Sequence, residues 1–342
     1  NGVEVLLKDN PSLQADMVVL AIGVTPDTVL AKEAGLELGI KESIVVNDRM
    51  ETSVPDIYAA GDAVQVKHYV TGNDALISLA GPANKQGRII ADNICGGDSR
   101  YLGSQGSSVI KVFDMTAATT GINETNAKKS GLEVDTVILS PMSHAGYYPG
   151  GKVMTMKVVF EKETYRLLGA QIIGYEGVDK RIDVLATAIH AGLKATQLKD
   201  LDLAYAPPYS SAKDPVNMAG FMIDNIAKGT LKQWHLEDMD KISKDKNAVL
   251  LDVRTVGEFS RGHINGFKNI PVDELRERIN EVEKGKPVYL ICQSGLRSYI
   301  ASRILEGNGY ETYNFSGGFR FYDAVANDHA LIERSYACGM DY

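Results

Sequence analysis

The sequence predicts a multidomain protein that combines α/β and α+β domains. Its 342 residues exceed the usual length of one domain, so two or three domains are expected. Short β-branched runs alternate with segments of helical periodicity, which is typical of α/β folds. Hydrophobic residues make up 44% of the chain and charged residues 23%, proportions found in soluble globular proteins with sizeable cores.

Charge, hydropathy and cysteine content exclude several classes of function. The net charge is −8 and no basic run occurs, which argues against a nucleic-acid surface. No apolar stretch approaches the roughly 20 residues that span a bilayer, so we expect no membrane partner. Cys95, Cys292 and Cys338 lie too far apart for a disulfide framework and fit a reducing cytoplasm. We expect no metal centre, and Cys338 in its polar tail is expected to be a free surface thiol.

The start of the chain has the pattern of an α/β domain. Asn1-Gly2-Val3 is not a natural beginning, and we expect the chain to be a fragment or the second part of a longer one. Gly2–Leu7 alternates like a strand, and the continuous apolar run Asp16–Ile22 suits a buried parallel strand. A turn at Thr25-Pro26-Asp27 then leads into a helix over Thr28–Ala34.

Small side chains precede a glycine and an aspartate in the string TSVPDIYAAGDA at residues 52–63. We predict a strand over Ile57–Ala60 that ends at Gly61-Asp62. Small residues let a ligand lie against the backbone, and a carboxylate at the end of a strand can accept a hydrogen bond from a sugar hydroxyl. A turn with a solvated aspartate would explain the same residues.

This string resembles the second flavin-binding motif of the pyridine nucleotide-disulfide oxidoreductases, which implies that Asp62 bonds the ribityl chain of FAD. Leu79–Arg88 resembles the helix start that places backbone N–H groups against the isoalloxazine in that family. Such N–H groups favour the negatively charged reduced flavin. A helix over Asn84–Ile94 should follow. The flavin-binding residues implied by the resemblance are Gly61, Asp62, Gly81, Pro82, Ala83 and Asn84.

No Gly-x-Gly-x-x-Gly fingerprint follows a predicted strand in this chain. In the family, the first FAD fingerprint, the NAD(P)H fingerprint and the redox cysteine all lie upstream of the Gly-Asp motif. The resemblance therefore implies that residues 1–24 end the NAD(P)H-binding domain and residues 25–102 form the C-terminal part of the FAD-binding domain.

A small, polar linker at Gly103–Ser108 introduces an α+β region. Residues 103–229 resemble the dimerisation domain of the same family, which implies a homodimer that packs face to face. The predicted strands are Val109–Phe113, Thr136–Leu139, Lys152–Phe160 and Leu167–Ile173, and the predicted helices are Asn123–Ser130, Val178–Ala191 and Phe221–Ile226.

Two loops of this region are rich in tyrosine, GYYPGG at residues 146–151 and AYAPPY at residues 204–209. Tyrosines that fill a dimer interface would account for them. The loops also resemble those of coenzyme A-disulfide reductases, in which one tyrosine from each loop flanks the redox cysteine of the partner subunit; this implies Tyr147 and Tyr205. A phenol, with a pKa of about 10, can hydrogen-bond a thiolate while staying protonated. Lys213 could attract a substrate phosphate or form a surface salt bridge.

A cysteine follows the apolar run Val288–Ile291. We expect Cys292 at the carboxyl end of a buried strand, with a helix over Ser298–Leu305 after the loop. Several loop N–H groups and the helix dipole would then favour the thiolate, while Gly295 lets the loop curl and Arg297 supplies a cation at its rim. A buried cysteine that merely follows a strand is the alternative.

The surrounding motifs resemble a rhodanese domain over residues 230–325, with a tail at 326–342. The resemblance implies that Cys292 carries sulfane sulfur as a persulfide. Only four residues separate Cys292 from Arg297, which suits a persulfide better than the five-residue loop of related phosphatases. The motifs are Asp252-Val253-Arg254, Glu258-Phe259, Gly262-His263-Ile264, Asn269-Ile270-Pro271 and the loop, whose Gln293, Ser294, Gly295 and Leu296 would bind the substrate.

Other elements of this region are also predicted. Asp252 and Arg254 are expected to brace the loop, and His263 is expected to be a structural hydrogen-bonder. We predict a helix at Asp273–Val282. The remaining predicted strands are Ala248–Val253 and Thr312–Phe315.

Together the resemblances imply a flavoprotein of the coenzyme A-disulfide reductase type fused to a rhodanese domain. Electrons would pass from NAD(P)H through FAD and an upstream cysteine to a sulfur–sulfur bond. The acceptor could be coenzyme A disulfide, coenzyme A persulfide or polysulfide, and the sequence does not choose between NADH and NADPH. The alternatives are a plain sulfurtransferase whose reductase portion is a dimerising scaffold, and an NADH oxidase.

Overall fold

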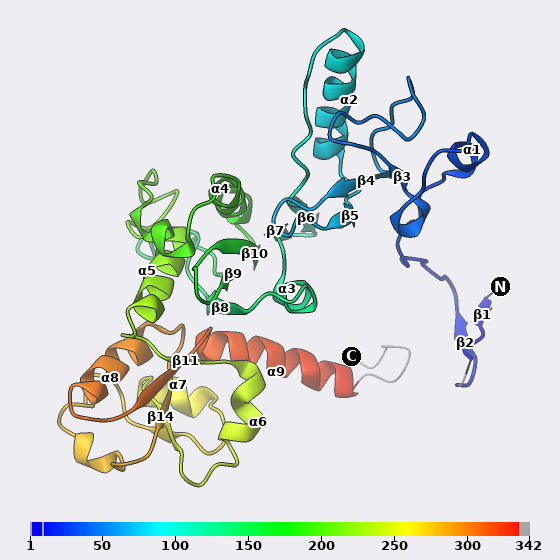
Figure 1. The fold of residues 1–342 in the computed structure, drawn as a ribbon. Helices are drawn as coiled ribbons and strands as arrows, with labels where there is room; N and C mark the ends of the chain where they lie inside the picture. The colour runs from blue at the N-terminus through cyan, green and yellow to red at the C-terminus, as the bar shows by residue number, and fades with distance from the viewer. Residues whose placement is uncertain (1, 9, 335–342) are drawn as a thin grey trace. The chain divides into compact units, whose positions relative to one another are not determined.

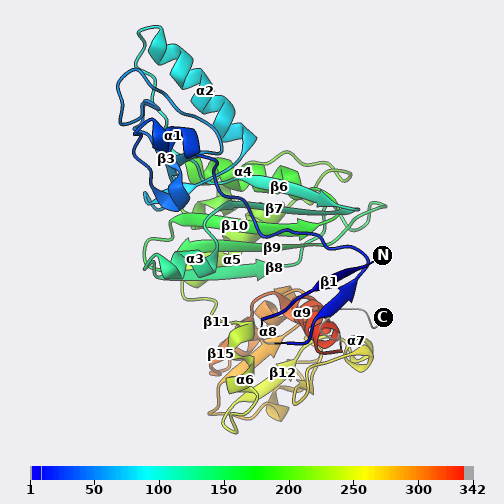
Figure 2. The ribbon, with the colours of Figure 1, turned by 90° about the vertical axis from the view of Figure 1, so that its right-hand side faces the viewer.

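The structure is a computed structural model that describes residues 2–8 and 10–334. Its described residues divide into two compact units (Figure 1, Figure 2). The first unit takes its residues from 1–67, 74–102 and 325–342, and the second from 68–73 and 103–324. Cys338, predicted to be a free surface thiol, lies outside the described residues.

The first unit contains two small sheets and one long helix. β1 and β2 form an antiparallel hairpin, and a second sheet has the order β3-β4-β5. Ile89 and Ile90 of helix α2 pack against a small core of Met50, Val64 and Val66. The elements are β1 (Val3–Val5), β2 (Leu13–Ala15), α1 (Val29–Glu33), a 3₁₀ turn (Ile40–Glu42), β3 (Ile44–Val45), β4 (Val64–Lys67), β5 (Asp74–Leu76) and α2 (Ala80–Ile94).

Three predictions for this unit are wrong. The apolar run Asp16–Ile22 is not a buried strand: Ile22 is 89% exposed, and among the described strands none pairs with the run, which a parallel strand requires. The segment Ile57–Ala60 makes only one isolated bridge, so no ladder forms. Helix α2 begins at Ala80 rather than Asn84, because proline is tolerated in a first turn, where its missing N–H has no intrahelical partner.

The second unit begins with a five-stranded antiparallel sheet of order β6-β7-β10-β9-β8, which Figure 2 shows with its strands side by side. Helix α4 packs on β7 and β10 through Ile182, Leu185 and Ile189, which belong to one large core. The elements are β6 (Ser108–Val112), β7 (Met115–Gly121), α3 (Glu124–Lys129), β8 (Val134–Leu139), β9 (Met154–Glu161), β10 (Leu167–Gly174), α4 (Val178–His190), a 3₁₀ turn (Ala195–Asp200) and α5 (Pro215–Ala227).

Two elements of this region differ from the prediction. Strand β7 was not predicted, because its sequence MTAATTG has no run of large apolar residues. Helix α5 starts at Pro215, six residues before the predicted Phe221, because the Asp214 carboxylate caps it by accepting from the Val216 N–H at 3.0 Å.

The second unit continues with a parallel sheet of order β11-β15-β14-β12-β13. Figure 1 shows α8 beside its strands. Buried clusters cover both faces, one around Leu290 and Leu305 and one around Trp234 and Phe315, as a parallel sheet requires. The elements are β11 (Gln233–Trp234), a 3₁₀ turn (Leu236–Asp238), α6 (Met239–Ile242), β12 (Val249–Asp252), α7 (Val256–Arg261), β13 (Lys268–Asn269), a 3₁₀ turn (Ile279–Glu281), β14 (Val288–Ile291), α8 (Leu296–Glu306), β15 (Thr312–Phe315) and α9 (Gly318–Arg334), of which residues 318–324 belong to this unit.

The helix predicted at Asp273–Val282 is wrong. Turns and a short 3₁₀ segment take its place. The Tyr310 hydroxyl lies 3.2 Å from the Ile279 carbonyl and 3.1 Å from the Val282 carbonyl, so a tertiary contact satisfies backbone groups that a helix would otherwise use. The predicted combination of α/β and α+β architecture is confirmed.

Candidate functional site

Cys292 lies directly after β14 and is 1% exposed. Its Sγ accepts hydrogen bonds from the Gly295 N–H at 3.1 Å and from the Ser298 hydroxyl at 3.2 Å. In the described structure these donors take the place of the several backbone N–H groups that were expected. Gly295 has a φ of +100°, a left-handed conformation that lets the loop turn back over the sulfur before α8 begins.

Residues of β15 and of the segment that follows it hold the loop in place. The Phe319 N–H donates to the Cys292 carbonyl at 2.7 Å, and the Asn314 side chain donates to the Gly295 carbonyl at 3.1 Å. A Cβ at Gly318 would lie 2.7 Å from both the Gln293 oxygen and the Ser294 nitrogen. The sequence reasoning missed Asn314 and Gly318. The glycine pair Gly317-Gly318, one residue after the end of a predicted strand, was the available signal.

Arg297 lies beside the loop, as predicted, but it is paired. Its two terminal nitrogens each donate to a Glu258 carboxylate oxygen at 2.7 Å. The Arg297 guanidinium, together with Thr255, lowers the pKa of Glu258 to about 2, and the same bonds raise the pKa of Arg297. Glu258 was quoted among the sequence motifs without a role.

A second ion pair, which is buried, supports the loop. Arg254 and Asp252, both fully buried, are joined by hydrogen bonds of 2.7 and 2.9 Å. The Arg254 guanidinium lies 3.5 Å from the Gln293 amide oxygen and 3.8 Å from the centre of the Phe319 ring. Asp252 and Arg254 therefore contact the loop and its support. The His263 ring lies 3.1 Å from the Phe259 carbonyl and stacks on the Phe259 ring, as a structural residue would.

The remaining loop residues differ in exposure. Gln293 and Ser294 are half-buried and Gly295 is buried, whereas Leu296 is 65% exposed. A substrate bound at the sulfur would therefore contact backbone groups of the loop, and the exposed Leu296 side chain would lie at the entrance of the site.

The two tyrosine-rich loops meet in the structure. The Tyr147 and Tyr205 hydroxyls lie 2.7 Å apart, and the hydrogen bond with Tyr147 raises the pKa of Tyr205. Both rings are exposed. Tyr205 also lines a cavity of about 490 Å³ together with Ser143, His144, Lys180, Arg181 and Tyr209. Tyr205 therefore connects the exposed phenol pair to the cavity.

Arg181 holds the two loops in place and was missed by the sequence reasoning. It is fully buried and donates to the carbonyls of Ser143 at 2.8 Å and Tyr209 at 3.3 Å, one beside each tyrosine loop. Its charge is balanced by Asp214 at 3.0 Å. Lys213 is exposed, and in the described part of the chain it has no carboxylate partner, so the predicted surface salt bridge is absent there.

The flavin-motif residues come together at the amino-terminus of α2. Gly61 has a φ of +87°, and its N–H donates to the side chain of Gln86, which is 1% exposed, at 2.8 Å. Asp62 is exposed, and its carboxylate has no partner among the described residues. Gln86 had no predicted role, although it ties the Gly-Asp turn to the helix.

The first turn of α2 contains Gly81, Pro82, Ala83 and Asn84. Leu79 precedes it and offers no side-chain cap. The uncapped N–H groups and the unpartnered Asp62 carboxylate fit a ligand that carries both hydrogen-bond acceptors and sugar hydroxyls.

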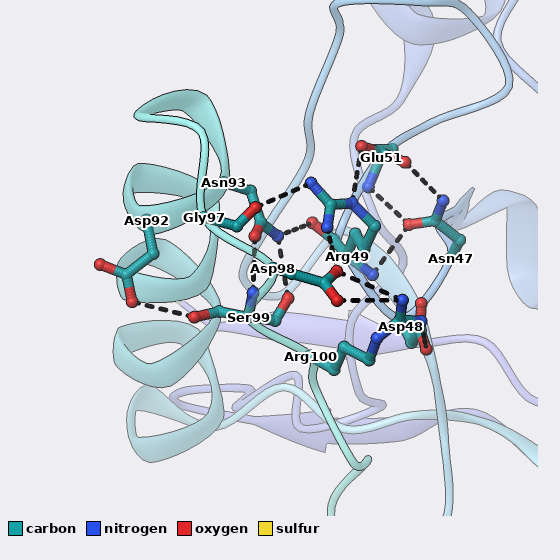
Figure 3. A network of polar contacts seen from close by, with 10 residues as sticks. All are labelled: Asn47, Asp48, Arg49, Glu51, Asp92, Asn93, Gly97, Asp98, Ser99 and Arg100. Atoms are coloured by element: carbon teal, nitrogen blue, oxygen red, sulfur yellow. Dashed lines mark hydrogen bonds and ion pairs between the residues drawn. The ribbon is translucent and has the colours of Figure 1, made fainter.

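The other end of α2 is anchored by a polar network (Figure 3). The Asn93 amide donates to the Arg49 carbonyl at 3.1 Å and to the Ser99 carbonyl at 2.9 Å. The Arg49 guanidinium pairs with Glu51 and Asp98. This network fixes the carboxyl end of α2 to the turn at residues 47–51.

Family comparisons agree with this division of sites. Residues 1–87 match the family described as pyridine nucleotide-disulphide oxidoreductase, and residues 107–215 match the dimerisation domain of that family. Residues 235–324 match the rhodanese-like domain. Most of the chain therefore resembles a pyridine nucleotide-disulphide oxidoreductase followed by a rhodanese-like domain. FAD and NAD(P)H are the cofactors of this family.

Individual relatives point the same way. A crystal structure of reduced CoADR-RHD from Bacillus anthracis is 48% identical, with a TM-score of 0.91 over 95% of this chain and 58% of that one. A NAD-dependent persulfide reductase from A. fulgidus is 41% identical, with a TM-score of 0.85 over 91% of this chain and 56% of that one.

A curated relative from Pyrococcus furiosus is named NAD(P)H sulfur oxidoreductase (CoA-dependent). It is 39% identical over 214 residues, which are 63% of this chain and 48% of the relative. The chain thus spans about half the length of the curated relatives it matches.

Within the described residues, no helix is both long enough and apolar enough to cross a membrane.

Proposed function

We propose that the full-length protein is a flavin-dependent NAD(P)H:disulfide or persulfide reductase that is coupled to a sulfur-transfer site at Cys292. The family matches and the names of the relatives support this function. The observation that supports the sulfur-transfer part is the buried Cys292 sulfur, which accepts two hydrogen bonds at the amino-terminus of α8. A plain sulfurtransferase on a scaffold does not fit these relatives, whereas the NADH oxidase alternative has the support of one relative of that name, from Methanocaldococcus jannaschii, which is 35% identical.

The proposal assigns a role to each part of the chain. Residues 1–24 would end the NAD(P)H-binding domain, residues 25–102 would belong to the FAD-binding domain, residues 103–229 would dimerise, and residues 230–325 would transfer sulfur, with a tail at 326–342. The reductase would act on coenzyme A disulfide, coenzyme A persulfide or polysulfide. A reductase of this kind would work in the cytoplasm, where thiols are kept reduced.

The residues of the flavin motif would bind and orient the cofactor. Bound FAD would supply two-electron transfer between NAD(P)H and a sulfur–sulfur bond. The Asp62 carboxylate would accept from a ribityl hydroxyl, and the first turn of α2, with Gly81, Pro82, Ala83 and Asn84, would face the isoalloxazine. Gln86 would keep the Gly61-Asp62 turn at the distance from α2 that lets both contacts form.

At the sulfur-transfer site, Cys292 would act as nucleophile. Its thiolate attacks the outer sulfur of a donor, the donor's sulfur–sulfur bond breaks, and the leaving group departs with the bonding electron pair. The Gly295 N–H and the Ser298 hydroxyl would stabilise the negative sulfur before and after the step. Gln293, Ser294 and Leu296 would line the substrate, and Arg297 would hold the rim.

Tyr147 and Tyr205 would serve the reductase of a partner subunit in a homodimer. Their paired hydroxyls offer donors to a thiolate or persulfide. Lys213, an exposed cation that follows the second tyrosine loop, would attract a phosphate of the substrate. Light scattering of the full-length protein at micromolar concentration should give a twofold dimer. A monomer would remove this role for the tyrosines.

Mass spectrometry tests the sulfur-transfer assignment directly. After incubation with thiosulfate or a persulfide, the peptide that contains Cys292 should gain one sulfur, about 32 Da. A flavin absorption band and NAD(P)H oxidation driven by coenzyme A disulfide should accompany the same preparation. Sulfur found on Cys95 instead, or a preparation that lacks flavin, would contradict the corresponding part of the proposal.

A further inference from the structure

Two arginines beside Cys292 are paired with carboxylates. Arg297 makes two hydrogen bonds of 2.7 Å to Glu258, and Arg254 makes hydrogen bonds of 2.7 and 2.9 Å to Asp252. Arg320 follows the residues that support the loop, but its guanidinium donates to the Ser140 carbonyl at 3.2 Å. The Ser140 carbonyl does not balance the charge of Arg320, but the two carboxylates lower the positive charge that Arg254 and Arg297 offer to a substrate at the mouth of the site.

Glu258 is held in its place independently of Arg297. The Thr255 backbone N–H and hydroxyl each donate to the same Glu258 oxygen at 2.9 Å, and the Glu258 N–H donates to the Thr255 hydroxyl at 3.2 Å. This is the capping box of α7, which orients the carboxylate toward the loop. With its pKa lowered to about 2, Glu258 is ionised throughout the neutral range.

The groups that contact the sulfur are neutral. The Gly295 N–H and the Ser298 hydroxyl can stabilise one negative sulfur atom, but they add no charge that would balance a second anionic group. Thiosulfate is a dianion, and its sulfonate would have to lie near the rim, where the Glu258 carboxylate already occupies Arg297. An organic persulfide brings at most one negative charge to the same place.

The rim also offers apolar contact. Leu296, directly before Arg297, is 65% exposed, and Val256, two residues before Glu258, is 62% exposed. The ion pair therefore has an exposed apolar side chain next to each of its members along the chain. Such side chains can contact the carbon body of an organic donor, which an inorganic donor lacks.

From these observations we propose that Glu258, acting through Arg297, makes the Cys292 site selective for persulfides of organic thiols over dianionic inorganic donors such as thiosulfate. This inference rests on the proposed sulfur-transfer function. In the step, the Cys292 thiolate attacks the outer sulfur of RS–SH, the RS–S bond breaks, and RS⁻ leaves with the electron pair. The product is Cys292–S–SH, and the proton stays on the transferred sulfur.

The experiment compares donors in the full-length protein and in its Glu258→Gln variant. Glutamine keeps the shape of the capping box but frees the charge of Arg297. The variant should load sulfur from thiosulfate with a kcat/KM about tenfold higher, while kcat/KM for the persulfide of 2-mercaptoethanol, generated in situ, should change less than about threefold. The thiosulfate rate of the variant should also fall with added salt more steeply than that of the wild type.

Glu281→Gln is the matched control. Glu281 also pairs with an arginine, Arg278, at 2.6 Å, and its pKa is also about 2, so this substitution changes the charge of the domain equally. It should leave the ratio of the two donors unchanged. An equal ratio in the wild type and the Glu258→Gln variant, or a wild type that already prefers thiosulfate, would overturn the inference.

Two measurements distinguish a failure of the donor selectivity from a failure of the proposed sulfur-transfer function. Fluorescence of the buried Trp234 reports whether the rhodanese-like core remains folded in each variant. Cys292→Ser should abolish loading from both donors. If sulfur loading persists in Cys292→Ser, the sulfur-transfer function itself is wrong. If Cys292→Ser loses loading but Glu258→Gln keeps the donor ratio of the wild type, only the selectivity is refuted.

Discussion

The Cys292 site and the flavin motif use the same local geometry, but their surroundings differ. Both place a chain turn with a left-handed glycine, Gly295 or Gly61, beside the amino-terminus of a helix. Gly295, Ser298 and Phe319 donate hydrogen bonds to Cys292, which is buried. At the flavin motif, Asp62 is exposed and the helix start has no side-chain cap. The first arrangement is complete around its reacting atom, whereas the second presents groups that a ligand has still to satisfy.

This difference predicts that the two sites can be disabled separately. The largest effect should come from Cys292→Ser in the full-length protein. A serine hydroxyl stays protonated and cannot carry sulfane sulfur, so loading from a persulfide should fall below detection by mass spectrometry. NAD(P)H oxidation by a disulfide that reacts directly at the reductase should continue. Loss of both activities would mean that the sites are not independent.

A smaller loss should follow Gly318→Ala, which leaves the cysteine in place. Its Cβ would lie 2.7 Å from the backbone of Gln293 and Ser294, so the loop must move. Sulfur loading should fall about tenfold or more, since a misplaced reacting group is costly, while flavin content stays unchanged.

Gly309→Ala is the control for backbone strain alone. Gly309 also has a positive φ, +82° against +70° at Gly318, but no atom lies within 4 Å of its Cβ position. Equal losses of sulfur loading in the two variants would show that strain, rather than contact with the loop, is the cause.

The same difference explains how much the sequence could predict. Cys292, Gly295 and Arg297 are close in sequence, so strand, loop and helix start could be predicted together, and the structure places them at one site. Asn314 and Gly318 were missed, because they reach the loop only through the order of strands in the sheet.

Wrong predictions have a related cause. The run Asp16–Ile22 has the composition of a buried strand, but burial depends on neighbours that composition does not specify. The helix predicted at Asp273–Val282 does not form, and the hydroxyl of Tyr310, which is distant in the sequence, hydrogen-bonds the carbonyls of Ile279 and Val282. Arg181 likewise was missed because it joins two loops that lie far apart in the sequence.

On the flavin side, Asp62→Ala should weaken FAD retention. A hydrogen bond to a charged group is worth roughly 1.5–3 kcal/mol, which corresponds to about a 10- to 100-fold loss of affinity. Flavin absorbance after dialysis measures the effect. Sulfur loading at Cys292 should not change, and unchanged flavin affinity would count against the assignment of Asp62.

Gln86→Leu should have a milder effect on the same cofactor. It removes the acceptor of the Gly61 N–H without touching the ligand, so flavin affinity should fall about three- to tenfold as the turn loosens. Asn93→Leu is the matched control, since it removes a buried amide from the opposite end of α2, next to Arg49. Equal flavin loss in both variants would indicate general destabilisation of the helix.

The smallest expected effect concerns acid stability at the Cys292 site. The Glu258 pKa is lowered from 4.5 to about 2, chiefly by Arg297. A carboxylate with a lowered folded-state pKa stabilises the fold fully above its ordinary pKa, and this contribution is lost as the pH falls from about 4.5 toward 2. Since the pair is partly exposed, its contribution should be only about 0.2–1 kcal/mol.

Urea unfolding followed by Trp234 fluorescence can measure this contribution, because Trp234 is the one tryptophan of the chain and lies in the rhodanese-like core. Between pH 5 and pH 3 the wild type should lose more stability than Glu258→Gln, whose side chain does not titrate. The Glu281→Gln control, which removes a paired but more exposed carboxylate, should show a smaller change in acid stability and no change in donor preference. A Glu258→Gln variant with the same acid sensitivity as the wild type would show that the Arg297 pair contributes nothing to folding, and that it serves the site alone.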